Sequence, residues 1–378
     1  MTKANDKGRR ISAVTVGALV ATFGLAACGA NKSAGGRATS SQSPQQAVQS
    51  AVTKLGSQSS LELAFSLPIT QSQAEQLHSA NSQAPTPAEA QALTTGQFFL
   101  TEASGHGEAL DSPKALTDQL NSLDAGLSFG SNNTPLEFRY VAQNLFLRVQ
   151  VQQLLSDVGQ PSSGAASRFT KGLNQLSSYI PGLGDLAQGK WVEVSHASLL
   201  PLEGLLEQSQ ASGSSSLSQT QMRTLRNEVL SSIQANSTAS SLTPSNGRGG
   251  YSVTVNVSGM LTTLLPQLQS TISSLPGFSS QASKAFSKAK NAIPAGKSAV
   301  IDVYTSGGKL TEADLDLNQF ANHKMSFPVP VRMAISSPGA PTAPSGATNL
   351  DLSKLPTLLG GLLGSLGHSS SSTAPVGA

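Results

Sequence analysis

The chain has 378 residues, of which only 12% are charged, and its formal net charge is +3. Four of its 24 lysines and arginines but only one of its 21 acidic residues lie in the first 27 positions, so the rest of the chain carries 20 of each sign. This balance argues against nucleic acid as a partner, and the single cysteine excludes disulfides and thiolate zinc sites within the chain.

The N-terminus has the layout of an export signal. Basic residues precede an uncharged run that is shorter than the ~20 apolar residues needed to cross a bilayer, so we expect residues 1–27 to be a signal peptide. Leu25, Ala26 and Ala27 directly precede Cys28 and resemble the bacterial lipobox, in which the cysteine sulfur receives lipid and cleavage makes it residue one. The alternatives are a buried cysteine, a reactive thiol or ordinary secretion. Two acyl chains would hold the protein firmly on the outer face of the membrane.

Composition sets the limits of the exported domain. Small and polar residues dominate residues 28–46 and predict a flexible tether that follows the lipidated cysteine. The Ser-rich end, residues 360–378, predicts a disordered tail. Between the two we expect one domain, residues 47–359.

Alternating apolar residues predict strands along this domain. The clearest runs are 61–69, 96–100, 136–151, 189–195, 251–258, 299–317 and 327–335. Gly307-Gly308 can adopt the positive φ angles of a tight turn, which predicts a hairpin there, and a second hairpin is expected about Gln143-Asn144. Because prolines donate no hydrogen bond, Pro328 and Pro330 predict that the last run is an edge strand.

Helical patterns lie between these strands. They cover 72–93, 113–123, 167–179, 197–208, 217–234, 261–274 and 281–292. Because strands in hairpins are interrupted by grouped helices and do not alternate strictly with them, the fold class is α+β and not doubly wound.

No pattern indicates catalysis, a metal or a cofactor. The five histidines stand far apart and form no H-x-x-x-H or H-E-x-x-H motif, and there is no P-loop. Glu312, Asp314 and Asp316 form the densest acidic cluster and would share one face of a strand. Such a face suits a cation or acid–base chemistry, but the simpler interpretation is a solvent face.

The order of elements resembles that of actinobacterial lipoproteins of the LppX/LprG type and their LolA-like relatives. The resemblance covers residues 47–359 and rests on short phrases: "GKWVEVS" before a helical region, the late hairpin "VIDVYTSGGKLTEADLDL" and the closing "SSPGAPTAPSGATNLDLSKL". It implies a curved antiparallel sheet, a half-barrel, with helices on its concave face and an apolar cavity for acyl chains. The longer Ser/Gln-rich insertions at 71–92 and 209–249 depart from the pattern and could fill such a cavity.

The resemblance also implies a binding function without chemistry. Helices 197–208 and 261–274 would line the cavity together with inward strand residues, namely Phe65, Phe98, Phe138, Tyr140, Leu147, Val253 and Val255. Read without the resemblance, these side chains are simply core. We therefore expect a monomeric, membrane-anchored extracytoplasmic protein that binds or carries a lipid or lipoglycan. The alternatives are an envelope interaction or sensor lipoprotein with a packed interior and, third, an enzyme.

Overall fold

The computed structural model describes a large part of the expected domain. The described residues are 42–77, 84–112, 122–130, 133–159, 164–198, 228–229, 231–243, 249–273, 296–321 and 325–352. The predicted signal peptide, the lipobox with Cys28 and the tail 360–378 lie outside them. Within these ranges, no helix is both long and apolar enough to cross a bilayer. The chain divides into two compact units. The first comprises residues 1–58, 110–112 and 216–311, and the second comprises residues 59–109, 113–215 and 312–378.

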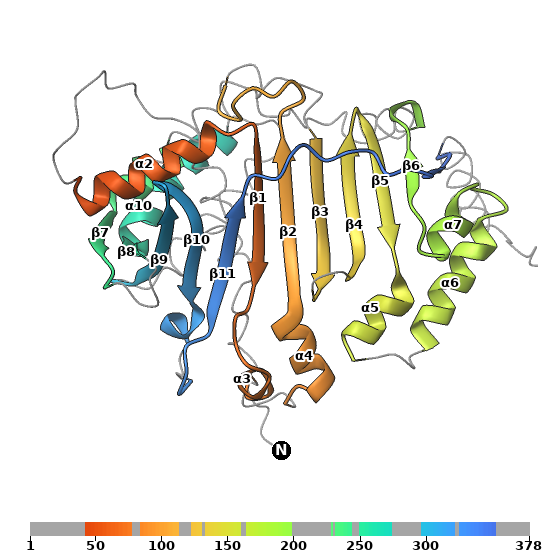
Figure 1. Ribbon diagram of the computed structural model, residues 1–378, viewed down its shortest axis with the longest axis horizontal. Coiled ribbons are helices and arrows are strands. Elements are labelled where there is room, and N and C mark those ends of the chain that lie inside the picture. Colours follow the sequence, from red (N-terminus) through yellow and green to blue (C-terminus); the bar gives the residue numbers. More distant parts are fainter. Residues whose placement is uncertain are drawn as a thin grey trace, which may run out of the picture. The chain divides into compact units, whose positions relative to one another are not determined.

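The first unit contains antiparallel strands and helices. Its elements are α2 (Pro44–Gly56), β7 (Ser237–Ser241), β8 (Gly250–Asn256), α10 (Val257–Ser273) and β9 (Ser298–Ser306). The strands pair in the order β7-β8-β9, α2 contacts β7, and α10 contacts β8 and β9 (Figure 1). Helix α2 begins at Pro44, where the side chain of Ser43 accepts a hydrogen bond from Gln46 N, so the last residues of the predicted tether are helical.

Alternation on β8 buries one of its two faces, as the sequence predicted. Val253 and Val255 point into the core, with 5% and 1% of their surface exposed, while Thr254 between them is exposed. After β9 the chain turns through Gly307 and Gly308, whose φ angles of 58° and 70° make the tight turn that the sequence predicted.

The second unit holds the larger sheet. Its strands are β1 (Ser60–Ser66), β2 (Gly96–Ala103), β3 (Ser122–Phe129), β4 (Asn133–Val141), β5 (Asn144–Val149), β6 (Val192–Val194), β10 (Lys309–Asp316, which starts in the first unit), β11 (Pro330–Ser336) and β12 (Thr348–Asn349). They pair in the order β12-β6-β5-β4-β3-β2-β1-β11-β10, and every pair except β12-β6 is antiparallel. This open, curved antiparallel sheet with helices confirms the predicted α+β fold class.

Five α-helices are described in the second unit. They are α3 (Gln71–Glu75), α4 (Pro87–Thr95), α5 (Val151–Asp157), α6 (Gly164–Leu176) and α7 (Leu183–Ala187), and a short 3-10 helix η2 (Leu317–Phe320) precedes β11. Helix α4 contacts β3, α5 contacts β4, and α7 contacts β5 and β6. Helices α3, α4 and α5 lie at one end of the strands of this unit (Figure 1).

Two sequence predictions about elements were wrong. The helix expected over 72–93 is two helices, because Pro87 has no N–H and Thr86 starts α4 afresh with a capping box to Glu89. The predicted edge strand β11 lies between β1 and β10. Its prolines are tolerated because Pro330 is the first strand residue, opposite Asp316, and pairing with β1 starts only at Arg332.

Candidate functional site

One face of the second unit's sheet is apolar across neighbouring strands. The register places Phe65 opposite Phe98, Phe98 opposite Leu127, and Leu127 opposite Leu136. The rings of Phe65 and Phe98 stack with 6.1 Å between their centroids. Phe98 nevertheless exposes 47% of its surface and Phe138, further along the same face, 38%. Aromatic side chains of this size are usually buried, so this face is the first candidate for a ligand.

A pocket of about 700 Å³ opens over this apolar face. Its apolar lining includes Phe65, Leu67, Leu93, Phe98, Leu127 and Phe129, and of the described residues only Ser66 and Glu89 contribute polar side chains to it. The volume falls within the range of small-molecule sites, and a lining of this kind recognises apolar groups. We call this the apolar pocket.

Helix α4 forms one wall of the apolar pocket. Ala90 on its inner side is fully buried in a small cluster with Ile69 and Ala74, which ties the helix to the chain before it. Leu93, one turn further on, is 38% exposed and lines the pocket. The carboxylate of Glu89 accepts a hydrogen bond from Thr86 N at 2.8 Å, so the one acidic side chain of the lining already caps the helix.

The structure brings together only some of the residues expected to line a cavity. Phe65 and Phe98 line the apolar pocket, and Phe138 lies on the same face of the sheet. Tyr140 shares that face two residues further along β4, but Leu147 packs against a core cluster built around Ile180 and Val192. Val253 and Val255 belong to the core of the first unit. Of the two helices expected to line a cavity, residues 199–208 lie outside the described residues, and 261–273 belong to α10 of the first unit.

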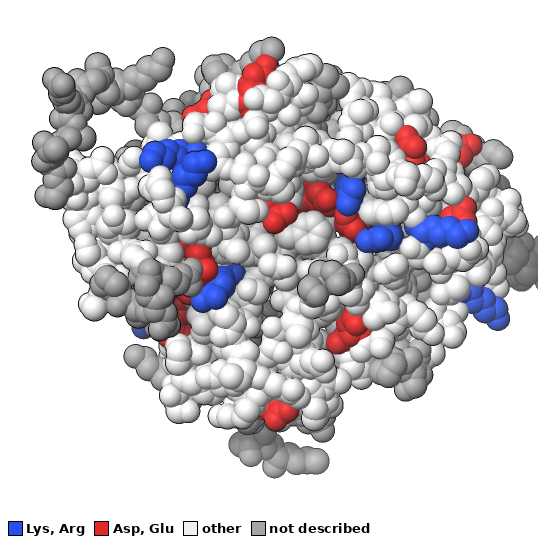
Figure 2. Space-filling view, in the orientation of Figure 1, with Lys and Arg blue, Asp and Glu red and all other residues white. Residues whose placement is uncertain are grey.

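The opposite face of the same sheet carries a row of paired charges. We call Glu62, Asp124, Glu137, Arg139 and Arg148 the charged row. Glu137 is only 4% exposed, and its two carboxylate oxygens accept hydrogen bonds from Arg139 at 2.5 Å and Arg148 at 2.7 Å. Figure 2 shows acidic and basic side chains next to each other over the middle strands of an otherwise largely uncharged face.

The ring of Trp191 and the backbone carbonyl of Thr342 contact the arginines of the charged row. The guanidinium groups of Arg139 and Arg148 lie 5.1 Å and 4.9 Å from the ring centre of Trp191, the chain's only tryptophan. Arg139 also donates a hydrogen bond to Thr342 O at 3.0 Å, within the segment that crosses this face between β11 and β12 (Figure 1). This hydrogen bond ties Arg139 to the crossing segment.

Burial raises the pKa of Asp124 to about 6, against the opposing effect of Arg139, whose Nε lies 3.1 Å from Asp124 Oδ2. The folded carboxyl therefore binds a proton at a pH where the unfolded one does not, so the folded state gains stability as the pH falls from 7 towards 4. We expect Asp124→Asn to reduce this gain by on the order of 1 kcal/mol, because one pKa unit is worth about 1.4 kcal/mol and water still reaches part of the side chain.

Urea unfolding of the wild type and of Asp124→Asn at pH 5 and pH 7.5 measures this difference. Asp302→Asn on β9, in the first unit, serves as the matched control, because it makes the same substitution in a different unit from Asp124. Equal pH dependence in the wild type and in Asp124→Asn would contradict the assignment.

The acidic cluster of β10 is occupied by protein partners. Arg332 on β11 forms ion pairs with Glu312 at 3.1 Å and with Asp314 at 3.0 Å. Asp316 Oδ1 accepts hydrogen bonds from Asn318 N and Val329 N. Among the residues that the structure describes, no group of three or more His, Cys, Asp or Glu side chains is placed to hold a metal ion.

One serine motif in the sequence can be interpreted only with the strands in place. Residues 126–130, "GLSFG", match the G-x-S-x-G spelling of a hydrolase nucleophile elbow. Ser128 lies inside β3, is only 9% exposed, and donates a weak hydrogen bond to Gln97 O at 3.4 Å. An elbow requires a sharp turn from strand to helix, and here β3 is followed by β4. The match is one of spelling only.

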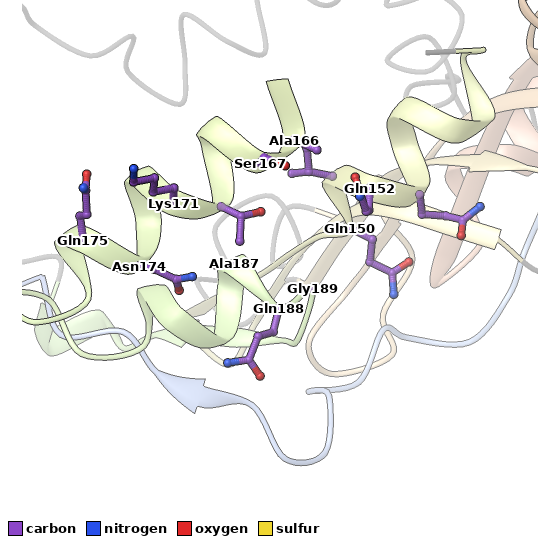
Figure 3. Close-up of a pocket in the computed structure, with 13 residues that line it drawn as sticks. Gln150, Gln152, Ala166, Ser167, Lys171, Asn174, Gln175, Ala187, Gln188 and Gly189 are labelled. Carbon is purple, nitrogen blue, oxygen red and sulfur yellow. The ribbon is translucent and has the colours of Figure 1, made fainter. Parts of the chain in front are cut away.

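A second hollow lies between α5, α6 and α7. It has a volume of about 920 Å³, and among the described residues its lining is mostly amide and hydroxyl side chains, with Lys171 as the one charged group (Figure 3). Lys171, Asn174 and Gln175 come from α6, whereas Gln150 directly precedes α5 and Gln188 directly follows α7. Most of these side chains are exposed, so we call this hollow the polar groove and assign it no ligand.

Comparisons with known proteins find similarity only among solved structures. No family model matches the chain, and no curated protein matches it. The crystal structure of LprF from Mycobacterium bovis aligns over 80% of this chain and 97% of its own, at 9% identity and a TM-score of 0.29. The lipoprotein LppX of Mycobacterium tuberculosis aligns over 79% and 96%, at 8% identity and a TM-score of 0.27. LppX is of the type that the sequence resembles.

Proposed function

We propose that the chain is an extracytoplasmic lipoprotein, anchored through Cys28, that binds the apolar part of a lipid or lipoglycan in the apolar pocket without catalysis. The observation that carries the proposal is the pocket itself. It is an apolar hollow of about 700 Å³ beside a stacked Phe65–Phe98 pair, in which Phe98 leaves nearly half of its surface exposed.

The physical driving force is the removal of apolar surface from water. An acyl chain over Phe98 and Leu127 would cover side chains that the protein alone leaves partly open, and burial contributes roughly 25 cal/mol per Å². The head group would remain in water, because Ser66 and Glu89 are the only polar side chains among the described residues of the lining and Glu89 already accepts hydrogen bonds from Thr86.

The binding proposal is tested on the full chain purified from membranes. Native mass spectrometry before and after organic extraction should show a lipid that copurifies, and the extracted protein should bind a hydrophobic dye that the loaded protein excludes. Absence of both lipid and dye binding would favour the alternative of a packed-interior interaction lipoprotein.

A further inference from the structure

Helix α6 and the turn after it expose large apolar side chains. Phe169 is 43% exposed, Leu176 is 49% exposed and Tyr179 is 57% exposed. In a helix, Phe169 and Leu176 lie two turns apart on one side, and Tyr179 follows Leu176 by three residues, in a turn held by a hydrogen bond from Tyr179 N to Leu176 O. We call these three side chains the α6 ridge.

The core of the second unit does not account for the α6 ridge. Helix α6 faces that core with other residues: Ala166 is 3% exposed, and Leu173 packs against the cluster that contains Ile180 and Leu183. The polar groove lies along Lys171, Asn174 and Gln175 of the same helix. Phe169 follows Ala166 by three residues and precedes Leu173 by four, so the α6 ridge borders the buried side of the helix, and none of its three side chains lines the polar groove.

The charged side chains of residues 160–184, which include α6, are all basic. Between 160 and 184 the sequence contains Arg168 and Lys171 but no aspartate or glutamate. Residues 168, 172 and 176 succeed one another at intervals of four, so Arg168 lies in the same row as Leu176, and Lys171, three residues after Arg168, is its neighbour at the edge of the polar groove. A helix with exposed aromatic and aliphatic side chains and flanking cations matches an anionic lipid surface.

We propose that the α6 ridge docks on the surface of an anionic membrane. Phe169 and Leu176 enter the boundary of the acyl chains, the amphipathic ring of Tyr179 lies at the head groups, and Arg168 pairs with lipid phosphate. This docking goes beyond the proposed function, because it needs neither the anchor at Cys28 nor an occupied apolar pocket.

A local fluorescent probe tests the docking on the full chain. In a Cys28→Ser background, Gly172→Cys places the only thiol between Arg168 and Leu176, at a position where an added Cβ meets no atom within 4 Å. An environment-sensitive dye on this thiol should move to shorter emission wavelength with vesicles of phosphatidylglycerol and phosphatidylcholine, and lipids labelled with a quencher should quench it. The same dye at Lys309→Cys, on an exposed position of the first unit, should not respond.

Two sets of variants make the test specific. Phe169→Ser/Leu176→Ser should weaken the vesicle response at least about tenfold, because two apolar side chains are lost from the contact. Arg168→Gln should weaken it about fivefold, and the matched control Lys171→Gln should weaken it less, because Lys171 lies further from Leu176 around the helix than Arg168 does.

Three outcomes would overturn the proposal: no response to anionic vesicles, an equal response in the serine variant, or a shift that follows protein concentration without vesicles. The last outcome would show that a second copy of the chain covers the ridge.

Discussion

Phe98→Asp is expected to empty the apolar pocket. In the protein without ligand, the new carboxylate would lie where Phe98 is 47% exposed, so it remains hydrated and the fold tolerates it. With an acyl chain in the pocket, the same carboxylate would lose water without gaining a partner, and the stacking with Phe65 would also be lost. We expect a cost on the order of 3 kcal/mol, which is about a 100-fold increase in the dissociation constant.

The measurement is the amount of lipid that copurifies, together with a titration of the extracted protein with a hydrophobic dye. Phe320→Asp is the matched control, because Phe320 is 39% exposed and lies outside the pocket lining. Val255→Trp, in contrast, is expected to lower the stability of the fold and to leave ligand binding unchanged. Its site is 1% exposed in the first unit, so overpacking should lower the unfolding free energy by about 1–3 kcal/mol and leave binding intact. Equal lipid loading of Phe98→Asp and the wild type would contradict the assigned site.

Several strands could be predicted from the sequence because apolar and polar residues alternate along them. Where one face of a strand is buried and the other is exposed, as with Val253, Thr254 and Val255, local sequence carries the whole signal. Strand β7 (Ser237–Ser241) could not be predicted in this way. Its serine, threonine and alanine side chains show little contrast, and pairing with β8 makes it a strand.

The composition of the pocket could be guessed, but not its position. Phe65, Phe98 and Leu127 meet because β1, β2 and β3 are neighbours, and no local pattern states that order. The same limit explains β11, which is paired with β1 although about 270 residues separate them in the chain, as the partners Leu63 and Ile335 show. A sequence pattern gives the face of a strand, whereas the register decides which faces share a site.

The charged row illustrates a different limit. Glu137 and Arg139 alternate with apolar residues on β4, and such positions normally form a solvent face. In the structure the segment that contains Thr342 crosses them, and Trp191 packs beside the arginines. Burial of these charges depends on a crossing from the far end of the chain, which leaves no periodic signal in β4 itself.

Cys28→Ser is expected to remove the covalent lipid from the chain. A serine oxygen does not replace the thiolate sulfur that would form the thioether. The wild type should begin at residue 28, carry the added mass of a diacylglycerol group and enter the detergent phase on partitioning. Each buried methylene contributes about 0.8 kcal/mol, so two chains hold the protein where one would release it.

The sharpest control for this prediction moves the thiol without removing it. Cys28→Ser/Ser33→Cys keeps one cysteine in the chain but moves it five positions beyond position 28, so that it no longer directly follows Leu25, Ala26 and Ala27. If lipidation requires the lipobox, this variant should show the same unmodified mass as Cys28→Ser. If the thiol is only an exposed reactive group, lipid mass would instead persist at position 33 or be missing from the wild type, and either result would contradict the anchor. Because neither the apolar pocket nor the α6 ridge is defined by Cys28, its replacement should leave dye binding by the extracted protein unchanged.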